Sequence, residues 1–151
     1  MLNSSSVVVI DSNLALWTVI PQLASHNPAS QFALWYQANT RLVAPAFWLA
    51  ECVSGIRLAL YSHRITPERG QQSLNDLFAL RVELAPLDES LCRSAYTWAE
   101  RLNQARAYDA LYLALAESLP AELWTADRRL VDRARQIGVT WVRWIGEGDA
   151  V

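Results

Sequence analysis

Hydrophobic and polar residues alternate along the chain in blocks whose lengths suit strands and helices in turn. Residues 7–10 are an unbroken β-branched run, Val-Val-Val-Ile, which predicts a strand buried on both faces. Further short apolar runs or alternations predict strands at 42–44, 81–85, 122–125 and 139–145. Longer segments with apolar residues at helical spacing lie between the strands. This order predicts an α/β protein with a parallel sheet covered by helices on both faces.

The helical segments begin at residue types that favour helix N-termini. We expect helices from Asp11 to about Ile20, from Pro28, from Pro45 to about Ser62, from Thr66, from Asp88 to about Asn103, over 107–119, and from Asp127 to about Ile137. No repeat or linker interrupts the pattern, so we expect one domain over residues 1–151 with a flexible tail at about 146–151.

Composition supports a compact globular protein. Hydrophobic residues make up 52% of the 151 residues and charged residues 19%. No apolar run reaches the roughly 18 residues that cross a bilayer, and the first residues lack the basic region of a signal peptide. Cys52 and Cys92 form no C-x-x-C pair and are expected to be small core residues. These features predict a cytoplasmic protein with no membrane association.

The charged residues exclude several classes of enzyme. Thirteen basic and fifteen acidic residues give a net charge of −2, which is low for a nucleic-acid binder unless metal ions offset the acids. Every basic residue is arginine, and the missing lysine excludes P-loop nucleotidases and Schiff-base enzymes. His26 and His63 are isolated, and we expect them to be surface or capping residues and not zinc ligands.

Four carboxylates have sequence surroundings that favour metal binding. Glu51 and Asp109 are each the only charged residue in an apolar helical stretch, where a carboxylate is costly unless paired or bound to a metal. Asp11 directly follows the first expected strand and Asp127 closely follows the fourth, so neighbouring strands would place both at one sheet edge. A shared cation would account for all four, and oxygen ligands favour Mg²⁺ or Mn²⁺ over zinc. Phosphodiester hydrolysis is the chemistry that suits such a cluster.

Each of these acids also has a structural interpretation. Asp11 and Asp127 can be helix N-caps, a role that is compatible with binding a metal. Glu51 can pair with a buried arginine such as Arg57, and Asp109 lies near the start of its helix, where the helix dipole favours an acid. One explanation that covers all four positions together is nevertheless simpler than four separate ones.

The segments that carry these acids resemble PIN domains, and in particular the VapC-type bacterial toxins. Residues 7–13 are similar to the opening strand and D-[ST]-[NS] motif of the family, and residues 45–51 to its P-x-x-x-x-x-E helix start. Residues 107–116 are similar to the A-Y-D-A-x-Y-L-A-L-A helix, and residues 123–130 to the L-x-T-x-D-x-x-L element. The stretch 101–106 departs from the family because it lacks the Ser or Thr often found before the third acid, and no basic groove is evident.

The resemblance implies an α/β/α sandwich with a five-stranded parallel sheet of order 3-2-1-4-5. It assigns catalysis and the binding of one or two Mg²⁺ or Mn²⁺ ions to Asp11, Glu51, Asp109 and Asp127. Thr125 would hydrogen-bond near the cluster, and Ser12 or Asn13 would orient Asp11 or a metal-bound water, with simple capping as the alternative. Arg128 or Arg129 would contact phosphate, although arginines at this spacing also line ordinary solvated helix faces.

The resemblance further implies a ribonuclease acting on RNA, a small antitoxin partner and a homodimer. Trp141 and Trp144 cannot both face one side of a regular strand, so one of them is a candidate contact for a partner, with core packing as the alternative. Two other functions stay open: an RNA-processing nuclease without an antitoxin, and a catalytically silent PIN domain that binds RNA or serves in assembly. A metal-dependent phosphatase is disfavoured, because Asn13 stands where the second acid of a D-x-D motif would be.

Overall fold

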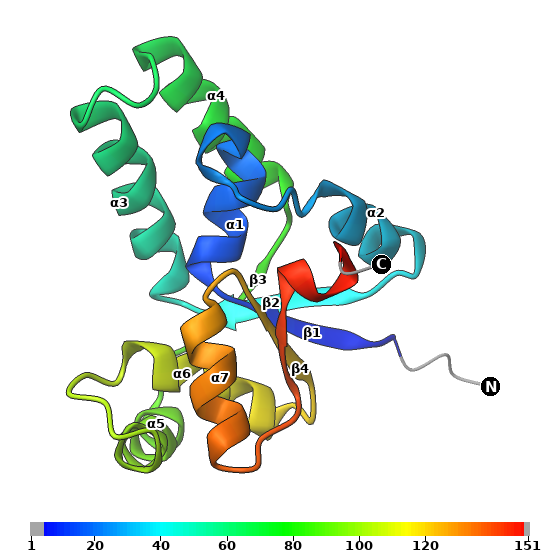
Figure 1. Ribbon diagram of the computed structural model, residues 1–151, viewed down its shortest axis with the longest axis vertical. Coiled ribbons are helices and arrows are strands. Elements are labelled where there is room, and N and C mark those ends of the chain that lie inside the picture. The colour runs from blue at the N-terminus through cyan, green and yellow to red at the C-terminus, as the bar shows by residue number, and fades with distance from the viewer. Residues whose placement is uncertain (1–4, 150–151) are drawn as a thin grey trace.

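A sheet of five parallel strands forms the centre of the computed structural model, which describes residues 5–149 (Figure 1). The strands are β1 (Val7–Ile10), β2 (Arg41–Pro45), β3 (Glu83–Ala85), β4 (Glu122–Thr125) and β5 (Val142–Trp144). Their spatial order is β3-β2-β1-β4-β5, and all four pairings are parallel. The fold class and strand order predicted above are thereby confirmed.

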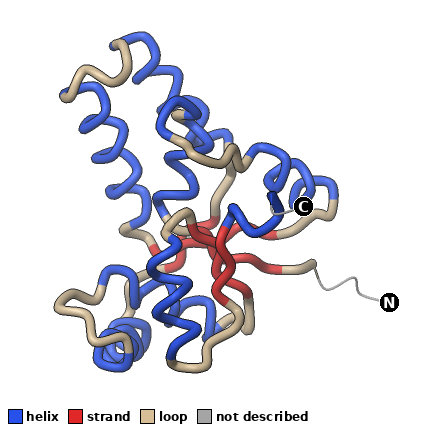
Figure 2. The backbone as a smooth tube through the Cα atoms, viewed as in Figure 1, coloured by secondary structure: helices blue, strands red, loops and turns tan. Residues whose placement is uncertain are grey.

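Helices cover the sheet on both sides (Figures 1 and 2). The α-helices within the described residues are α1 (Ser12–Val19), α2 (Ala29–Gln37), α3 (Trp48–Tyr61), α4 (Pro67–Ala79), α5 (Glu89–Arg101), α6 (Tyr108–Ser118) and α7 (Arg128–Gln136). Two 3-10 helices, η1 (Pro21–Leu23) and η2 (Ile145–Asp149), complete the set. Figure 1 shows α1, α3 and α4 on one side of the sheet and α5, α6 and α7 on the other. None of the helices described is both long enough and apolar enough to span a bilayer.

The core lies against both faces of the central strands. Val9, Ile10 and Leu123 are fully buried, as expected for parallel strands covered on both sides. On one of these sides α1 packs closely against α3, where a Cβ atom at Gly55 would lie 2.4 Å from Leu16 Cδ1. Glycine at this position therefore permits the close approach of two helices that both begin near the carboxyl edge of the sheet.

One helix begins later than the sequence pattern predicted. Pro45 was expected to open a helix, but it is the last residue of β2 and pairs with Ala85 of β3. The next backbone amide, that of Ala46, donates to the Ala85 carbonyl at 2.8 Å and extends the ladder. The chain then turns, and α3 starts at Trp48. The expectation for Pro45 was wrong because proline is tolerated at a strand end as readily as at a helix start.

The C-terminal segment is more ordered than expected. Residues 145–149 form η2, and the Glu147 carboxylate makes ion pairs with Arg135 of α7 and with Arg143 of β5. These contacts replace the predicted flexible tail over residues 146–149, while residues 150–151 lie outside the described part of the chain.

The two C-terminal tryptophans are both half-buried, so neither is fully exposed. Trp141 lies edge-on to Trp98 with ring centroids 5.6 Å apart, and Trp144 lies edge-on to His26 at 4.9 Å. His26 is thus part of an aromatic cluster and not a surface residue. Each tryptophan finds a ring partner from a different side of the sheet, which explains how residues three apart are both packed.

The two cysteines occupy different environments. Cys52 is buried in α3, as expected, whereas Cys92 is exposed on α5, where the core interpretation was wrong. Both are free thiols.

Candidate active site

The carboxyl ends of β1 and β4 lie next to each other at one edge of the sheet. Ile10, the last residue of β1, pairs with Trp124 of β4 in a parallel register. Asp11 follows β1 directly, and Asp127 caps the helix that follows β4. Both carboxylates are therefore at the same edge, which is where the crevice of an open parallel sheet lies.

Thr125 connects these two acids. The Asp11 side chain is 5% exposed and the Thr125 side chain is fully buried. The Thr125 hydroxyl donates to Asp11 Oδ2 and accepts from the Asp127 backbone N–H at 2.9 Å. Asp11 Oδ1 accepts from the Leu14 N–H at 2.8 Å, and Asp127 Oδ1 accepts from the Arg129 N–H at 2.9 Å. Both aspartates are therefore N-caps, and each keeps carboxylate oxygen lone pairs that these bonds do not use.

Burial dominates the ionisation of Asp11. Burial is the largest effect, and it raises the pKa of Asp11 to about 7 even though hydrogen bonds from Thr125 and Leu14 lower it. The negative charges of Asp109 and Asp127 raise the pKa further. At pH 7 about half of the Asp11 carboxyl groups would therefore keep their proton unless positive charge is supplied.

Glu51 lies in the first turn of α3 and is held by hydroxyl groups. Tyr112 of α6 donates to Glu51 Oε1 at 2.6 Å. Burial raises the pKa of Glu51, hydrogen bonds from the Tyr112 and Ser12 hydroxyls oppose that shift, and the charge of Asp109 adds to it. Ser12 therefore acts on Glu51, whereas the sequence placed it beside Asp11.

The proposed ion pair between Glu51 and an arginine is not found. The Arg57 guanidinium carbon instead lies 5.8 Å from the centroid of the Tyr61 ring, farther along α3. Among residues 5–149, the salt bridges found involve none of the four candidate acids.

Asp109 lies in the first turn of α6 and has an amide partner. Gln104 Nε2 donates to Asp109 Oδ2 at 3.1 Å, while Gln104 Oε1 is buried with no hydrogen-bond partner. Burial is the largest cause that raises the pKa of Asp109; the Gln104 hydrogen bond lowers it, the Asp127 charge raises it and Arg133 lowers it. Gln104 lies within residues 101–106, the stretch that lacks the Ser or Thr often found in the family.

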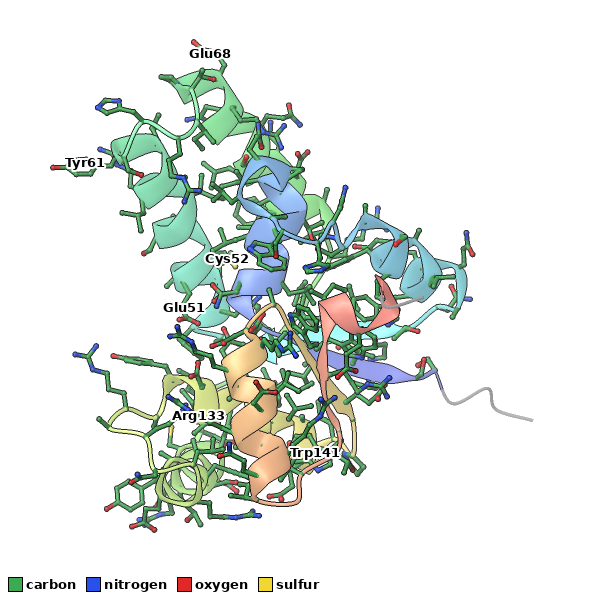
Figure 3. All side chains as sticks on the ribbon, viewed as in Figure 1. Glu51, Cys52, Tyr61, Glu68, Arg133 and Trp141 are labelled. Carbon is green, nitrogen blue, oxygen red and sulfur yellow. The ribbon has the colours of Figure 1, made fainter. Side chains whose placement is uncertain are left out.

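The fold brings the four acids from four separate segments into electrostatic contact. Asp11 is affected by Asp109 and Asp127, Glu51 by Asp109, and Asp109 by Asp127. Figure 3 shows Glu51 at the end of α3 nearest the sheet and Arg133 on α7. Within residues 5–149, no three histidine, cysteine, aspartate or glutamate side chains are already arranged around one ion position.

The donor set fits a hard divalent cation. The site contributes carboxylate oxygens from Asp11, Glu51, Asp109 and Asp127. Burial and mutual repulsion raise the pKa of three of them, and the salt bridges of the described residues leave all four without an arginine partner. A bound cation would remove this repulsion, and Mg²⁺ or Mn²⁺ accepts an all-oxygen site in which water completes the shell.

Three arginines of α7 lie near the site. The Arg128 guanidinium carbon lies 5.0 Å from the centroid of the Trp144 ring, and Arg129 is exposed with its backbone amide on Asp127. Arg133, farther along α7, is the arginine whose charge acts on Asp109. Asn13 is exposed on α1.

Sequence reasoning missed the residues that hold the acids in place. They are Tyr112 on Glu51, Gln104 on Asp109, and Trp48, whose indole N–H donates to the Asp11 carbonyl at 3.2 Å. A signal existed for one of them, because Tyr112 is three residues from Asp109 on α6 and carries a hydroxyl that needs a partner when buried.

Comparisons with known proteins match most of the chain to one family. The family model described as PIN domain matches residues 8–136. The chain is 33% identical over 126 residues to Ribonuclease VapC9 of Mycobacterium tuberculosis, which covers 83% of this chain and 90% of that protein.

Solved structures share the fold. VapBC2 from Rickettsia felis, bound to a DNA fragment from its promoter, superposes with a TM-score of 0.62 at 17% identity, covering 91% of this chain and 96% of that one. VapBC-5 from Mycobacterium tuberculosis, a member of the VapBC family of toxin-antitoxin systems, superposes with a TM-score of 0.55 at 17% identity, covering 92% and 97%.

Proposed function

The chain belongs to the PIN-domain family, among its VapC-type members, and from this premise we propose that it is an endoribonuclease dependent on a divalent cation. The observation that carries the proposal is that Asp11, Glu51, Asp109 and Asp127 come together at one sheet edge. Burial and mutual repulsion raise the pKa of the first three, and the salt bridges of the described residues involve none of the four. The identity to a ribonuclease over most of both chains supports RNA as the substrate.

In this proposal each acid has a defined support. Asp11 is fixed by the Leu14 amide and the Thr125 hydroxyl, Glu51 by the Tyr112 hydroxyl, and Asp109 by the Gln104 amide. These hydrogen bonds orient the carboxylate oxygens in advance, as outer-shell partners do at metal sites. The acids would together hold Mg²⁺ or Mn²⁺, which when bound neutralises phosphate charge and activates water for attack on phosphorus.

We further propose that the chain is the toxin of a toxin-antitoxin pair. The support is the likeness to VapBC-5, a member of the VapBC family of toxin-antitoxin systems, together with the identity to Ribonuclease VapC9. A homodimer and a cytoplasmic location belong to the same proposal, and the two free thiols are compatible with a reducing compartment. A small reading frame encoding an antitoxin beside the gene would separate this function from that of an RNA-processing nuclease.

Cleavage of total tRNA by the purified chain tests the proposal. We expect cleavage in Mg²⁺ or Mn²⁺ that EDTA abolishes and that the double variant Asp11→Asn, Asp109→Asn loses. The matched control is Asp88→Asn, Asp132→Asn, which removes the same charge from exposed positions and should cleave normally. Mass spectrometry must first show that no antitoxin has co-purified. Cleavage that persists in the Asp11, Asp109 variant would refute the site, and no cleavage by the antitoxin-free wild-type protein would favour a silent binding module.

A further inference from the structure

The facing sides of α3 and α6 carry two pairs of residues next to the carboxylates. On α3, Phe47 and Glu51 are one turn apart and are joined by the Glu51 N–H to Phe47 carbonyl bond of 3.1 Å. On α6, Tyr108 and Tyr112 are likewise one turn apart. Residues four apart lie on the same face of a helix, so each pair presents both members to the opposite helix.

Ring contacts between α3 and α6 link the ring of Tyr108 to the Glu51 carboxylate. The Phe47 ring centroid lies 5.9 Å from that of Tyr108, with the planes inclined by 33°, and 5.3 Å from that of Tyr112. The Tyr112 hydroxyl then donates to Glu51 at 2.6 Å. Tyr108 is therefore held in a fixed relation to Glu51 by two further rings.

Exposure increases along this row of rings. Tyr112 is 2% exposed, Phe47 is half-buried, and Tyr108 is 57% exposed although it directly precedes Asp109. Phe47 supports Tyr108 from one side and leaves much of its surface in contact with solvent. Tyr61 and Tyr96 are exposed as well, at 73% and 69%, so what sets Tyr108 apart is its contact with Phe47 and its place directly before Asp109.

We propose that Tyr108, resting on Phe47, is a stacking platform for one unpaired base of the RNA, adjacent to the phosphate at the carboxylates. The proposal rests on the proposed function and adds a base-binding position to it. A nucleobase suits this site because its flat π-face can stack on an aromatic ring that a neighbouring residue holds rigid. A backbone phosphate beside the acids places the attached base within reach of the ring on the adjacent residue of α6.

The platform predicts how the enzyme selects its substrate. Stacking accepts any base with a free face, so Tyr108 favours single-stranded over paired RNA and discriminates only weakly between sequences. Bases inside a duplex are already stacked and are not available to the ring. Tyr108 therefore contributes to selection of unpaired nucleotides at the cleavage site.

Binding and cleavage of one short single-stranded RNA test this role. The RNA carries 2-aminopurine or an abasic nucleotide at each position in turn, and binding is measured in Ca²⁺ to limit hydrolysis. We expect the wild-type protein to quench 2-aminopurine strongly at one position, and Tyr108→Ala to lose that quenching and to weaken binding about tenfold, since stacking contributes roughly 1–3 kcal/mol per base. Tyr108→Phe should behave as the wild type. An abasic nucleotide at that position should weaken wild-type binding but leave Tyr108→Ala unaffected.

Tyr61→Ala is the matched control, because Tyr61 is 73% exposed and lies at the far end of α3 from Glu51 (Figure 3). Circular dichroism confirms that each variant is folded. If wild-type protein cleaves the RNA while Tyr108→Ala binds and quenches as the wild type does, the platform is refuted and the nuclease function stands. If Tyr108→Ala weakens binding equally with and without the abasic nucleotide, Tyr108 contacts something other than a base and the inference is likewise overturned. Position-specific quenching without any cleavage would support the platform while refuting the nuclease function.

Discussion

At Asp11, burial, hydrogen bonding and neighbouring charge act together on one carboxyl group. Burial raises its pKa, the Thr125 hydroxyl and the Leu14 amide lower it, and two nearby acids raise it again, which leaves it at about 7. The same balance, with burial dominant, raises the pKa of Glu51 and of Asp109. The site is thus a source of instability for the metal-free protein.

This instability has a definite pH dependence. The pKa of Asp11 is about 7 in the folded chain and 3.8 as its ordinary value, so between these pH values the folded state retains a proton that the unfolded state has released. The free energy of unfolding without metal should therefore fall as pH rises from about 4 to 7, by up to about 1.4 kcal/mol per pH unit for one group. Glu51 and Asp109 contribute with the same sign.

Urea unfolding in EDTA at pH 5 and at pH 7.5 measures this effect. The wild-type protein should be less stable at the higher pH, and Asp11→Asn should show a smaller difference because the variant lacks the titrating group. If both proteins show the same difference, or if the wild-type protein is more stable at pH 7.5, the pKa of Asp11 is not raised in the folded chain and the prediction is wrong.

The sequence could single out the four acids as candidates, and the family resemblance pointed to Thr125 beside them, but Tyr112 and Gln104 were not predicted. Asp11 and Asp127 were recognisable because parallel strands bring the residues that follow them to one edge. Tyr112 and Gln104 were not, since their partners depend on how α3 meets α6 and on the conformation of the loop before α6. Arg133 was not separated from its neighbours because arginine reach and direction are tertiary properties.

At the scale of elements, two of the acids that we propose as metal ligands are also helix N-caps. Asp11 caps α1, Asp127 caps α7 and Asp88 caps α5 in a similar way, with its carboxylate accepting from the Leu91 N–H at 2.8 Å. Of these three caps only Asp88 is exposed, and its charge is not among those that shift the pKa of Asp11, Glu51 or Asp109. Substitutions at these capping aspartates can therefore separate the loss of an N-cap from the loss of a site carboxylate.

Two substitutions separate these roles. Asp127→Asn keeps a good N-cap, so stability should change little, but it removes a carboxylate and should lower RNA cleavage by more than the roughly 10–100-fold that loss of an outer-shell partner costs. Asp88→Ala removes a cap and should cost about 1 kcal/mol of unfolding free energy while cleavage stays normal. Urea unfolding and initial cleavage rates measure both. Normal cleavage by folded Asp127→Asn would leave Asp127 as a cap alone.

The end of β2 and the η2 segment could not be predicted correctly from the local sequence pattern. The type and order of the elements followed from hydrophobic spacing, because each strand and each helix buries a face with its own period. Pro45 was misplaced since proline suits both a strand end and a helix start, and only the pairing with Ala85 decides between them. The η2 segment was expected to be flexible because its ion pairs to Arg135 and Arg143 come from other elements.

At the scale of the whole molecule, the topology explains how four acids from distant parts of the chain come together at one place. The net charge of the whole chain is only −2, so it gives no sign of this local concentration of acids. The strand order β3-β2-β1-β4-β5 brings the segments around residues 11, 51, 109 and 127 to a single edge, although they are spread over most of the chain. The order of motifs and the parallel sheet could be predicted from the sequence. The facing sides of α3 and α6, which carry the proposed base platform, required the assembled structure.

Binding of Mn²⁺ to the purified chain at pH 7, followed by calorimetry or electron paramagnetic resonance, tests most directly whether the four acids form one cation site. We predict saturable binding by the wild-type protein and by the control Asp88→Asn, Asp132→Asn, and loss of that binding in Asp11→Asn, Asp109→Asn. Binding should also raise the melting temperature, because the cation binds the folded chain and not the unfolded one. Wild-type affinity for Mn²⁺ in a folded Asp11→Asn, Asp109→Asn variant would contradict the account.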